Sequence, residues 1–428
     1  MKERLKFVMA HEEEFDVHGR VNMTALCEAY GVSRPTGYKW LERFRKAGEQ
    51  VSALEDASRR PLSSPTATSE EWVELVLAAR RLHPRWGARK LHAWLRRQVA
   101  KKRGLRLRAP LVKMPQPSTI SAILHRHGLI RRYRKRSRIP VRTKPFAACR
   151  RSNDTWCVDF KGQFRTGDGA RVYPLTIMDA HSRFLIRCEL VLDPDARSVI
   201  PIFESAFREF GLPKAIRSDN GPPFASKAPG GLTTLSAWWA RLGISHERIT
   251  PGKPQENGRH ERMHLTLKQE TAMPPASSPK TQQQRFDLFR KDYNEERPHE
   301  ALDQDVPADR YRRSTRPLPG SVPQIEYPLF WETRRVRKSG RAMLFRSGVH
   351  VGPALVGELV GFEWVADRRW LVRYGKVLLG LFDEGNPKRG LVRVKKQLDP
   401  SSTIAIPKTS DRGEGERGTR PNKLRDSV

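Results

Sequence analysis

Three acidic residues in the middle of the chain stand where a fold can aim side chains at one point. Asp159 lies in the alternating run 155–160, Asp219 follows a short apolar run, and Glu256 stands in the first turn of an expected helix. Three converging carboxylates repel one another unless a hard cation neutralises them, and Mg²⁺ takes oxygen ligands. Two such ions activate the attacking oxygen and stabilise the leaving oxygen of a phosphodiester. These residues therefore predict a metal-dependent enzyme that cuts and joins DNA.

Each acid also has an ordinary structural explanation. Asp159 can end a strand, Asp219 with the following Asn-Gly can form a turn, and Glu256 can stabilise a helix start. Singly, these explanations are the commoner ones, but the order of the three acids and their flanking residues favour a shared site. Asp179 is a rival acid, which we expect at a hairpin, bonded to Ser182 or Arg183.

Three histidines are alternative metal ligands, namely His246, His260 and His264. Hard Mg²⁺ prefers oxygen, so we expect these side chains at the surface or near DNA instead.

Alternating short apolar runs and helices must position the acids. The strands are expected at 155–160, 172–178, 184–191, 215–218 and 244–245, and the helices at 195–210, 235–242 and 255–270. On the last helix Glu256 shares a face with His260, Met263 and Leu267. Three basic residues lie elsewhere on that helix, where they can reach phosphates: Arg259, Arg262 and Lys268.

The first 130 residues predict two helical modules, residues 1–60 and 68–130. In the first, Gly31 separates two amphipathic helices, a pattern typical of a helix-turn-helix, although small helical bundles imitate it. Its second helix would present four side chains to a DNA groove: Arg34, Thr36, Lys39 and Arg43. The second module predicts helices over 70–82, around Trp94, and over 120–127.

The net charge of +34 comes from 81 Lys and Arg against 47 Asp and Glu. From Leu75 to Asn153 the chain has no acid and 24 basic residues, whereas a solvated surface normally mixes both signs. A polyanion is the partner that such a run predicts, held by phosphate contacts that weaken with salt. The densest part belongs to a basic linker, 131–150, and holds Arg131, Arg132, Arg134, Lys135 and Arg136.

After residue 325 the pattern is short strands with glycine turns, which predicts a small C-terminal β-barrel over 326–399. An independent protein-binding barrel is the alternative. Residues 400–428 are polar and predict a disordered tail. Four cysteines without paired spacing, no signal-peptide pattern and no long apolar run predict a cytoplasmic, nucleoid-associated protein with reduced thiols.

Three segments of the chain resemble the bacterial insertion-sequence transposases of the DDE, or retroviral-integrase, superfamily: residues 217–224, 251–264 and 293–302. The resemblance covers roughly residues 20–310, with Asp159, Asp219 and Glu256 in the catalytic places. In one departure, 36 residues separate Asp219 from Glu256, one more than is usual.

The resemblance implies a ribonuclease-H-like α/β core over 151–310, with a mixed five-stranded sheet flanked by helices. It implies two Mg²⁺ ions, with Mn²⁺ able to substitute, held by Asp159, Asp219 and Glu256. It further implies binding of the element's terminal inverted repeats, strand cleavage and strand transfer, and a homo-oligomer on double-stranded DNA. The alternatives are a catalytically inactive DNA-binding regulator and a nuclease without joining activity.

Overall fold

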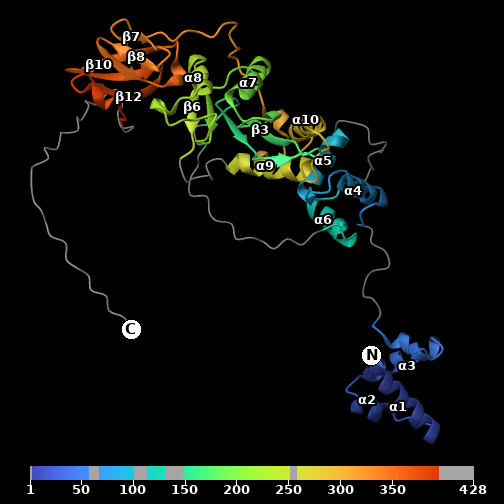
Figure 1. The fold of residues 1–428 in the computed structure, drawn as a ribbon. Coiled ribbons are helices and arrows are strands. Elements are labelled where there is room, and N and C mark those ends of the chain that lie inside the picture. Colours follow the sequence, from blue (N-terminus) through green and yellow to red (C-terminus); the bar gives the residue numbers. More distant parts are fainter. Residues whose placement is uncertain are drawn as a thin grey trace, which may run out of the picture. The chain divides into compact units, whose positions relative to one another are not determined.

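The computed structural model describes residues 2–56, 67–100, 113–130, 146, 149–250 and 258–394. Glu256, the five basic residues of 131–136 and the tail 400–428 lie outside these ranges. The chain divides into two compact units, Met1–Glu70 and Glu71–Val428, which are considered separately below (Figure 1).

The first unit is a small helical bundle. It contains α1 (Lys2–His18), α2 (Met23–Ala29), α3 (Arg34–Lys46) and the 3₁₀ turn η1 (Val51–Leu54). Asn22 caps α2 by accepting a hydrogen bond from the Ala25 amide. A Cβ on Gly37 would lie 2.6 Å from the Phe7 ring, so only glycine lets α3 pack this closely. Two short helices joined by a turn at Gly31 are confirmed.

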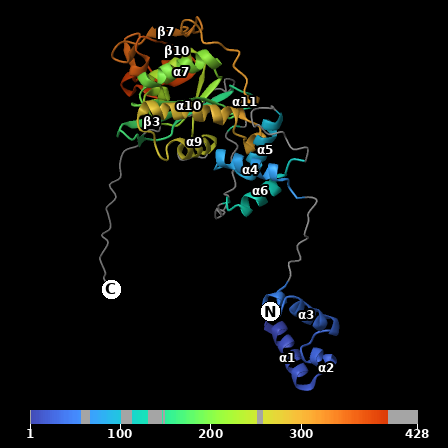
Figure 2. The same ribbon diagram turned by 90° about the vertical axis from the view of Figure 1, so that its right-hand side faces the viewer.

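The second unit begins with α4 (Glu70–Leu82), α5 (Ala88–Ala100) and α6 (Pro117–Arg126), which enclose a core that includes Trp72, Trp86 and Leu91. Helix α5 lies beside α10 in both Figure 1 and Figure 2. The Trp94 indole N–H and the Gln98 amide both donate to the Glu296 carboxylate, at 3.0 and 2.8 Å. These bonds attach the helical segment to the rest of the unit.

The central sheet is mixed. Its strands are β1 (Thr155–Phe160), β2 (Phe164–Arg165), β3 (Arg171–Asp179), β4 (Leu185–Val191), β5 (Ala215–Ser218) and β6 (Ser245–Arg248). Strand β1 pairs with β3 antiparallel and with β5 parallel, β4 lies outside β3, and β6 pairs with β5 in parallel. The two-residue β2 pairs with the start of β3 and continues the line of β1. The predicted five strands are therefore present, with β2 as a short extension.

Helices cover both faces of this sheet. On one face, α7 (Ala196–Phe210) and α8 (Thr234–Arg241) bury Trp156, Val158 and Phe203 in the main core. On the other face lie α9 (Gly258–Thr271) and α10 (Pro279–Glu295), which pack on Met178 and Leu185. Helix α10 was not among the predicted elements. Because side chains alternate along a strand, Asp159 shares the α9 face with Thr176 of β3.

The C-terminal part is an antiparallel sheet in the order β13-β12-β11-β10-β7 with a separate hairpin β8-β9. The strands are β7 (Glu332–Arg335), β8 (Arg341–Leu344), β9 (Ser347–His350), β10 (Leu359–Ala366), β11 (Arg369–Tyr374), β12 (Val377–Asp383) and β13 (Leu391–Val392). In the described strands β13 and β7 are the unjoined edges, so the predicted closed barrel is not confirmed.

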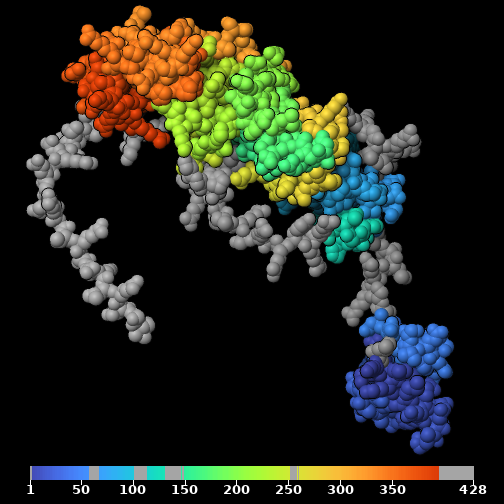
Figure 3. All heavy atoms as spheres, viewed as in Figure 1, coloured from blue at the N-terminus to red at the C-terminus, as the bar shows by residue number. Residues whose placement is uncertain are grey.

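Helix α8 joins the two sheets into one body. Ala237 of α8 and Leu232 just before it belong to the C-terminal core, whereas Leu235 and Trp239 belong to the main core. Figure 3 shows the orange and red atoms of the C-terminal sheet against the yellow-green segment that contains α8. Between the sheets run the short α11 (Pro307–Arg310) and an irregular connector. No helix among the described residues is long and apolar enough to cross a membrane.

Candidate active site

Parallel pairing of β1 with β5 brings two of the predicted acids together. Cys157 lies opposite Arg217 in the register, so Asp159 and Asp219, each two residues further on, stand at the same level. Neighbouring strands lie about 4.8 Å apart, and residues of equal parity point to the same face. Both acids thus stand at the carboxyl ends of adjacent strands.

The electrostatics of the pair are those of a site that lacks positive charge. Burial above all, together with the neighbouring charges of Asp219 and Glu261, raises the pKa of Asp159 to about 7, although a hydrogen bond from the Phe160 main chain and the charge of Lys161 act in the opposite direction. Burial also raises the pKa of Asp219. A divalent cation between these carboxylates would remove the repulsion that disfavours their ionised forms.

The loop after β5 holds the Asp219 carboxylate in place. Asn220 donates from its side-chain amide to the Ile249 carbonyl at 2.8 Å, which ties the loop to the end of β6. At Gly221 an added Cβ would lie 3.1 Å from Oδ2 of Asp219, so the missing side chain leaves room beside the carboxylate. The other oxygen, Oδ1, is buried and has no hydrogen-bond partner among the described residues. A buried, unsatisfied carboxylate oxygen suits a metal ligand.

A third acid, Glu261, lies near this site, although it was not among the predicted site residues. Glu261 lies in the first turn of α9 and is close enough to raise the pKa of Asp159. Helix geometry accounts for its position, because Glu261 stands one turn before His264, whose Nδ1 lies 3.8 Å from Oδ2 of Asp159. In the sequence, the only sign of this role is that Glu261 stands three residues before His264. That sign can be used only once His264 is known to face the sheet.

The donor set fits a hard divalent cation, since it consists of carboxylate oxygens from Asp159, Asp219 and Glu261. As the side chains stand, no three His, Cys, Asp or Glu residues in the described ranges are gathered tightly enough to hold a metal ion. The Glu261 side chain is exposed.

The histidine prediction was wrong for α9. His260 is fully buried and His264 is 5% exposed, beneath the carboxylates and not at the surface. The Nε2 atoms of both rings lie beside the Thr176 hydroxyl, at 2.5 and 2.7 Å. Burial lowers the pKa of His260 to about 3 and that of His264 to about 2, so both rings are neutral. The contact of His264 with Asp159 is therefore not an ion pair. A periodicity that places His260 with Met263 and Leu267 on one face already signals the burial of His260.

His246 is also partly buried, at the far side of the site. Its Nε2 lies 2.8 Å from the Ser218 hydroxyl, which donates to the Asp219 carbonyl. It is thus tied to the strand end that carries Asp219.

Asp179, the rival acid, has a structural role. Its carboxylate is fully buried and accepts from the Ser182 hydroxyl and amide at 2.6 and 2.8 Å, and from the Asn153 amide at 2.8 Å. The expected bond to Ser182 is confirmed, and this acid holds the β3–β4 turn.

The predicted DNA-contact residues are distributed over separate elements. On α3, Arg34 and Lys39 are exposed, whereas Thr36 and Arg43 are partly buried. On α9, Arg262 and Lys268 are exposed, and Arg259 belongs to the same helix. These positions are compatible with phosphate contacts, which stay a prediction.

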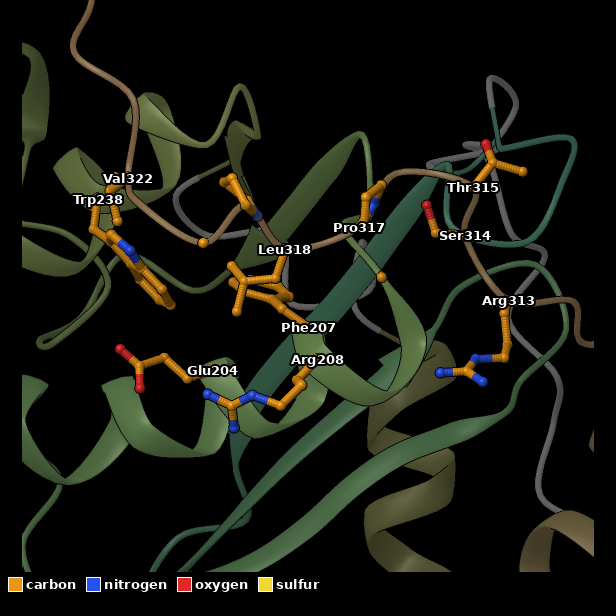
Figure 4. A pocket seen from close by; sticks show the side chains of 13 residues that line it. Glu204, Phe207, Arg208, Trp238, Arg313, Ser314, Thr315, Pro317, Leu318 and Val322 are labelled. Atoms are coloured by element: carbon orange, nitrogen blue, oxygen red, sulfur yellow. The ribbon is translucent and has the colours of Figure 1, made fainter.

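A groove of about 590 Å³ lies elsewhere, under the connector that follows α11. Figure 4 shows Phe207 and Glu204 of α7 and Trp238 of α8 facing Leu318 and Arg313 of the connector. None of the candidate acids lines it, so the groove is separate from the carboxylate site.

Comparison with known proteins places the catalytic and DNA-binding parts in known families. Integrase core domain models match residues 150–254 and 242–307, a helix-turn-helix model matches 3–61, and a homeodomain-like model matches 36–124.

Two similar proteins come from bacterial insertion elements. The chain is 28% identical to the uncharacterized 31.7 kDa protein of insertion element IS407 from Burkholderia multivorans, over 55% of this chain and 80% of that protein. It is 27% identical to the uncharacterized 39.2 kDa protein of insertion element IS476 from Xanthomonas euvesicatoria, over 62% and 71%.

Among solved structures, the HTLV-2 integrase catalytic core in complex with magnesium aligns with 38% of this chain and 98% of that one, at 15% identity and a TM-score of 0.30. The integrase-core and helix-turn-helix matches, together with the similarity to insertion-element proteins, support an insertion-sequence transposase of the DDE, or retroviral-integrase, superfamily.

Proposed function

We propose that this transposase binds the terminal inverted repeats of its element, cleaves them and joins the ends to target DNA in a metal-dependent reaction. The observation that carries the proposal is the placement of Asp159 and Asp219 on adjacent parallel strands, where Glu261 also raises the pKa of Asp159. A site that concentrates carboxylates in this way is suited to phosphodiester chemistry with divalent cations.

The third carboxylate is assigned to Glu261, with Glu256 as the alternative. Glu261 lies in the first turn of α9, one turn before His264, whose Nδ1 faces Asp159, and its charge raises the pKa of Asp159. Asp159, Asp219 and the third acid would hold two Mg²⁺ ions, with Mn²⁺ able to substitute. The bound ions would supply charge neutralisation at the phosphate and activation of the attacking oxygen.

The residues of the chain itself hold the two metal-binding carboxylates in place. Asp159 is fixed by strand pairing and Asp219 by the Asn220 bond to Ile249. The groups that hold DNA would lie outside this centre: the α3 side chains Arg34, Thr36, Lys39 and Arg43, the basic linker, and the α9 side chains Arg259, Arg262 and Lys268. Two element ends must meet for strand transfer, so we expect a homo-oligomer on DNA.

The test incubates the full chain with labelled element-end DNA, a supercoiled target plasmid and Mg²⁺. We expect nicked ends and end–plasmid joined products, both abolished by EDTA. Asp159→Asn keeps the shape of the side chain but cannot hold the ions as a carboxylate, so it should abolish cleavage while end binding stays near wild type.

The outcomes separate the alternatives named above. Cleavage without joined products would indicate a nuclease, and end binding without cleavage would indicate a regulator. Metal-dependent cleavage that survives in Asp159→Asn would contradict the assignment of the site.

A further inference from the structure

A chain of buried polar groups leads from α9 to the Asp159 carboxylate. The Thr176 hydroxyl lies between the Nε2 atoms of His260 and His264, and Nδ1 of His264 faces Oδ2 of Asp159 at 3.8 Å. Thr176 and His260 are fully buried and His264 nearly so. Water is thus excluded from the chain of contacts, and its protons must be shared among these groups alone.

The hydroxyl has a single proton and two lone pairs, which restricts the ring tautomers. If Thr176 donated to His260, that ring would carry its own proton on Nδ1. Nδ1 of His260 is buried without a partner in the described structure, and a buried N–H left without an acceptor is rarer in folded proteins than a buried acceptor left without a donor. His260 therefore carries its proton on Nε2 and donates to Thr176.

The Thr176 proton then has two acceptors to choose between. The main-chain oxygen of Asp159 lies 3.1 Å away, and Nε2 of His264 lies 2.7 Å away. Donation to the main-chain oxygen would force the His264 proton onto Nε2, and a bare Nδ1 lone pair would face the Asp159 carboxylate. Donation to His264 places its proton on Nδ1, where it points at the carboxylate, and this arrangement is attractive.

We propose that His260, Thr176 and His264 form a donor relay that positions Asp159, in which each group donates to the next and His264 Nδ1–H donates to Oδ2. None of the three is a catalytic residue; they are positioning residues that act through Asp159. The relay fixes the rotation of the carboxylate and presents its other oxygen to a cation. When Asp159 is ionised the last contact becomes a charge-assisted hydrogen bond, which is shorter than 3.8 Å.

The expected effect of the relay on metal affinity rests on the proposed metal site, whereas the contacts among His260, Thr176 and His264 do not. Hydrogen-bond partners of metal-binding side chains typically change metal affinity by about 10- to 100-fold when they are removed. Thr176→Val removes the hydroxyl at nearly constant volume and interrupts the relay. His264→Leu removes the final donor, whereas His264→Asn retains an N–H near the position of Nδ1.

The first experiment reads the tautomers of the intact chain, labelled with ¹⁵N-histidine, from imidazole ¹H–¹⁵N spectra. We expect the proton on Nε2 of His260 and on Nδ1 of His264, with the signals assigned by the single variants His260→Asn and His264→Asn. A proton on Nε2 of His264 in the wild-type protein overturns the relay. The tautomers are read in the wild-type protein; the variants serve only to assign its signals, and their melting temperatures check that they fold.

The second experiment measures Mn²⁺ binding by calorimetry, with melting temperatures as a check of folding. We expect about 10- to 100-fold weaker binding for Thr176→Val and His264→Leu, and near-wild-type binding for His264→Asn. Thr271→Val is the matched control, because Thr271 is a buried threonine of α9 that bonds to the Leu267 carbonyl, away from the acids.

Equal Mn²⁺ affinity in wild type and Thr176→Val overturns the positioning role. If the wild-type protein binds no Mn²⁺, the proposed metal site fails instead, and the tautomers alone decide whether the relay exists.

Discussion

At the residue scale, the site depends on which acids the backbone places at one point. Asp159 and Asp219 follow from the alternation along one strand and the end of another, and both positions were predictable from the sequence. The third acid was harder to predict, because Glu256 and Glu261 lie five residues apart and both are expected near the start of one helix. Only the fold favours one of them, because the charge of Glu261 raises the pKa of Asp159 and Glu261 lies one turn before His264, which faces Asp159.

Glu261→Gln should therefore reduce strand cleavage by roughly 10²- to 10³-fold, because it removes a preorganised charge at the reacting phosphate. Glu256→Gln, its matched control on the same segment, should retain most of the activity. Rates of end nicking under single-turnover conditions compare the two. The reverse pattern would return the assignment to Glu256.

At the element scale, the pattern of apolar residues was enough to predict the buried strands. It was not enough to predict elements that are held by polar side chains. The strands β1, β3, β4 and β5 lie close to their predicted ranges because their buried residues alternate or run continuously. Strand β7 consists of Glu-Thr-Arg-Arg and has no apolar residue to signal it.

Helix α10 was missed for a related reason. It has few apolar residues, and two of its buried side chains are amides, Gln282 and Asn294. Gln282 donates to the Thr271 carbonyl and accepts from the Ala276 amide. Such bonds make polar residues part of the core, and they are invisible to a hydrophobic pattern. The buried His264 of α9 escaped prediction in the same way.

Asn294 gives a test of this explanation. Its side chain accepts from the Leu185 amide at 2.8 Å and donates to the Leu185 carbonyl at 3.0 Å, which holds α10 on β4. Asn294→Ala leaves both main-chain groups buried and unsatisfied, so the free energy of unfolding should fall by about 2–4 kcal/mol. Chemical denaturation measures it, with the exposed Lys291→Ala as control. A loss below about 0.5 kcal/mol, the range of ordinary surface changes, would contradict this role.

At the scale of the whole molecule, the charge distribution determines how DNA is held. The net charge of +34 is concentrated between Leu75 and Asn153, so the phosphate contacts should be many and insensitive to base sequence.

Replacing Arg131, Arg132, Arg134, Lys135 and Arg136 by glutamine should weaken binding to specific and random duplexes alike. Each lost phosphate contact lowers the slope of log affinity against log salt by about 0.9. Fluorescence anisotropy over a salt series gives the slope. An unchanged slope would show that these side chains do not contact the backbone. Arg165→Gln, on the exposed end of β2, is the control for Arg131→Gln alone, because each removes one positive charge.

The position of α8 between the two sheets limits where this chain can be divided. Leu232 and Ala237 are covered by side chains of the C-terminal sheet, and Arg241 pairs with Glu358 at 3.0 Å. A fragment that ends in the connector before β7 would expose that apolar side of α8 to water and would remove the Glu358 partner of Arg241. Shortened proteins that end before β7 should therefore aggregate, even though they retain every acid of the site.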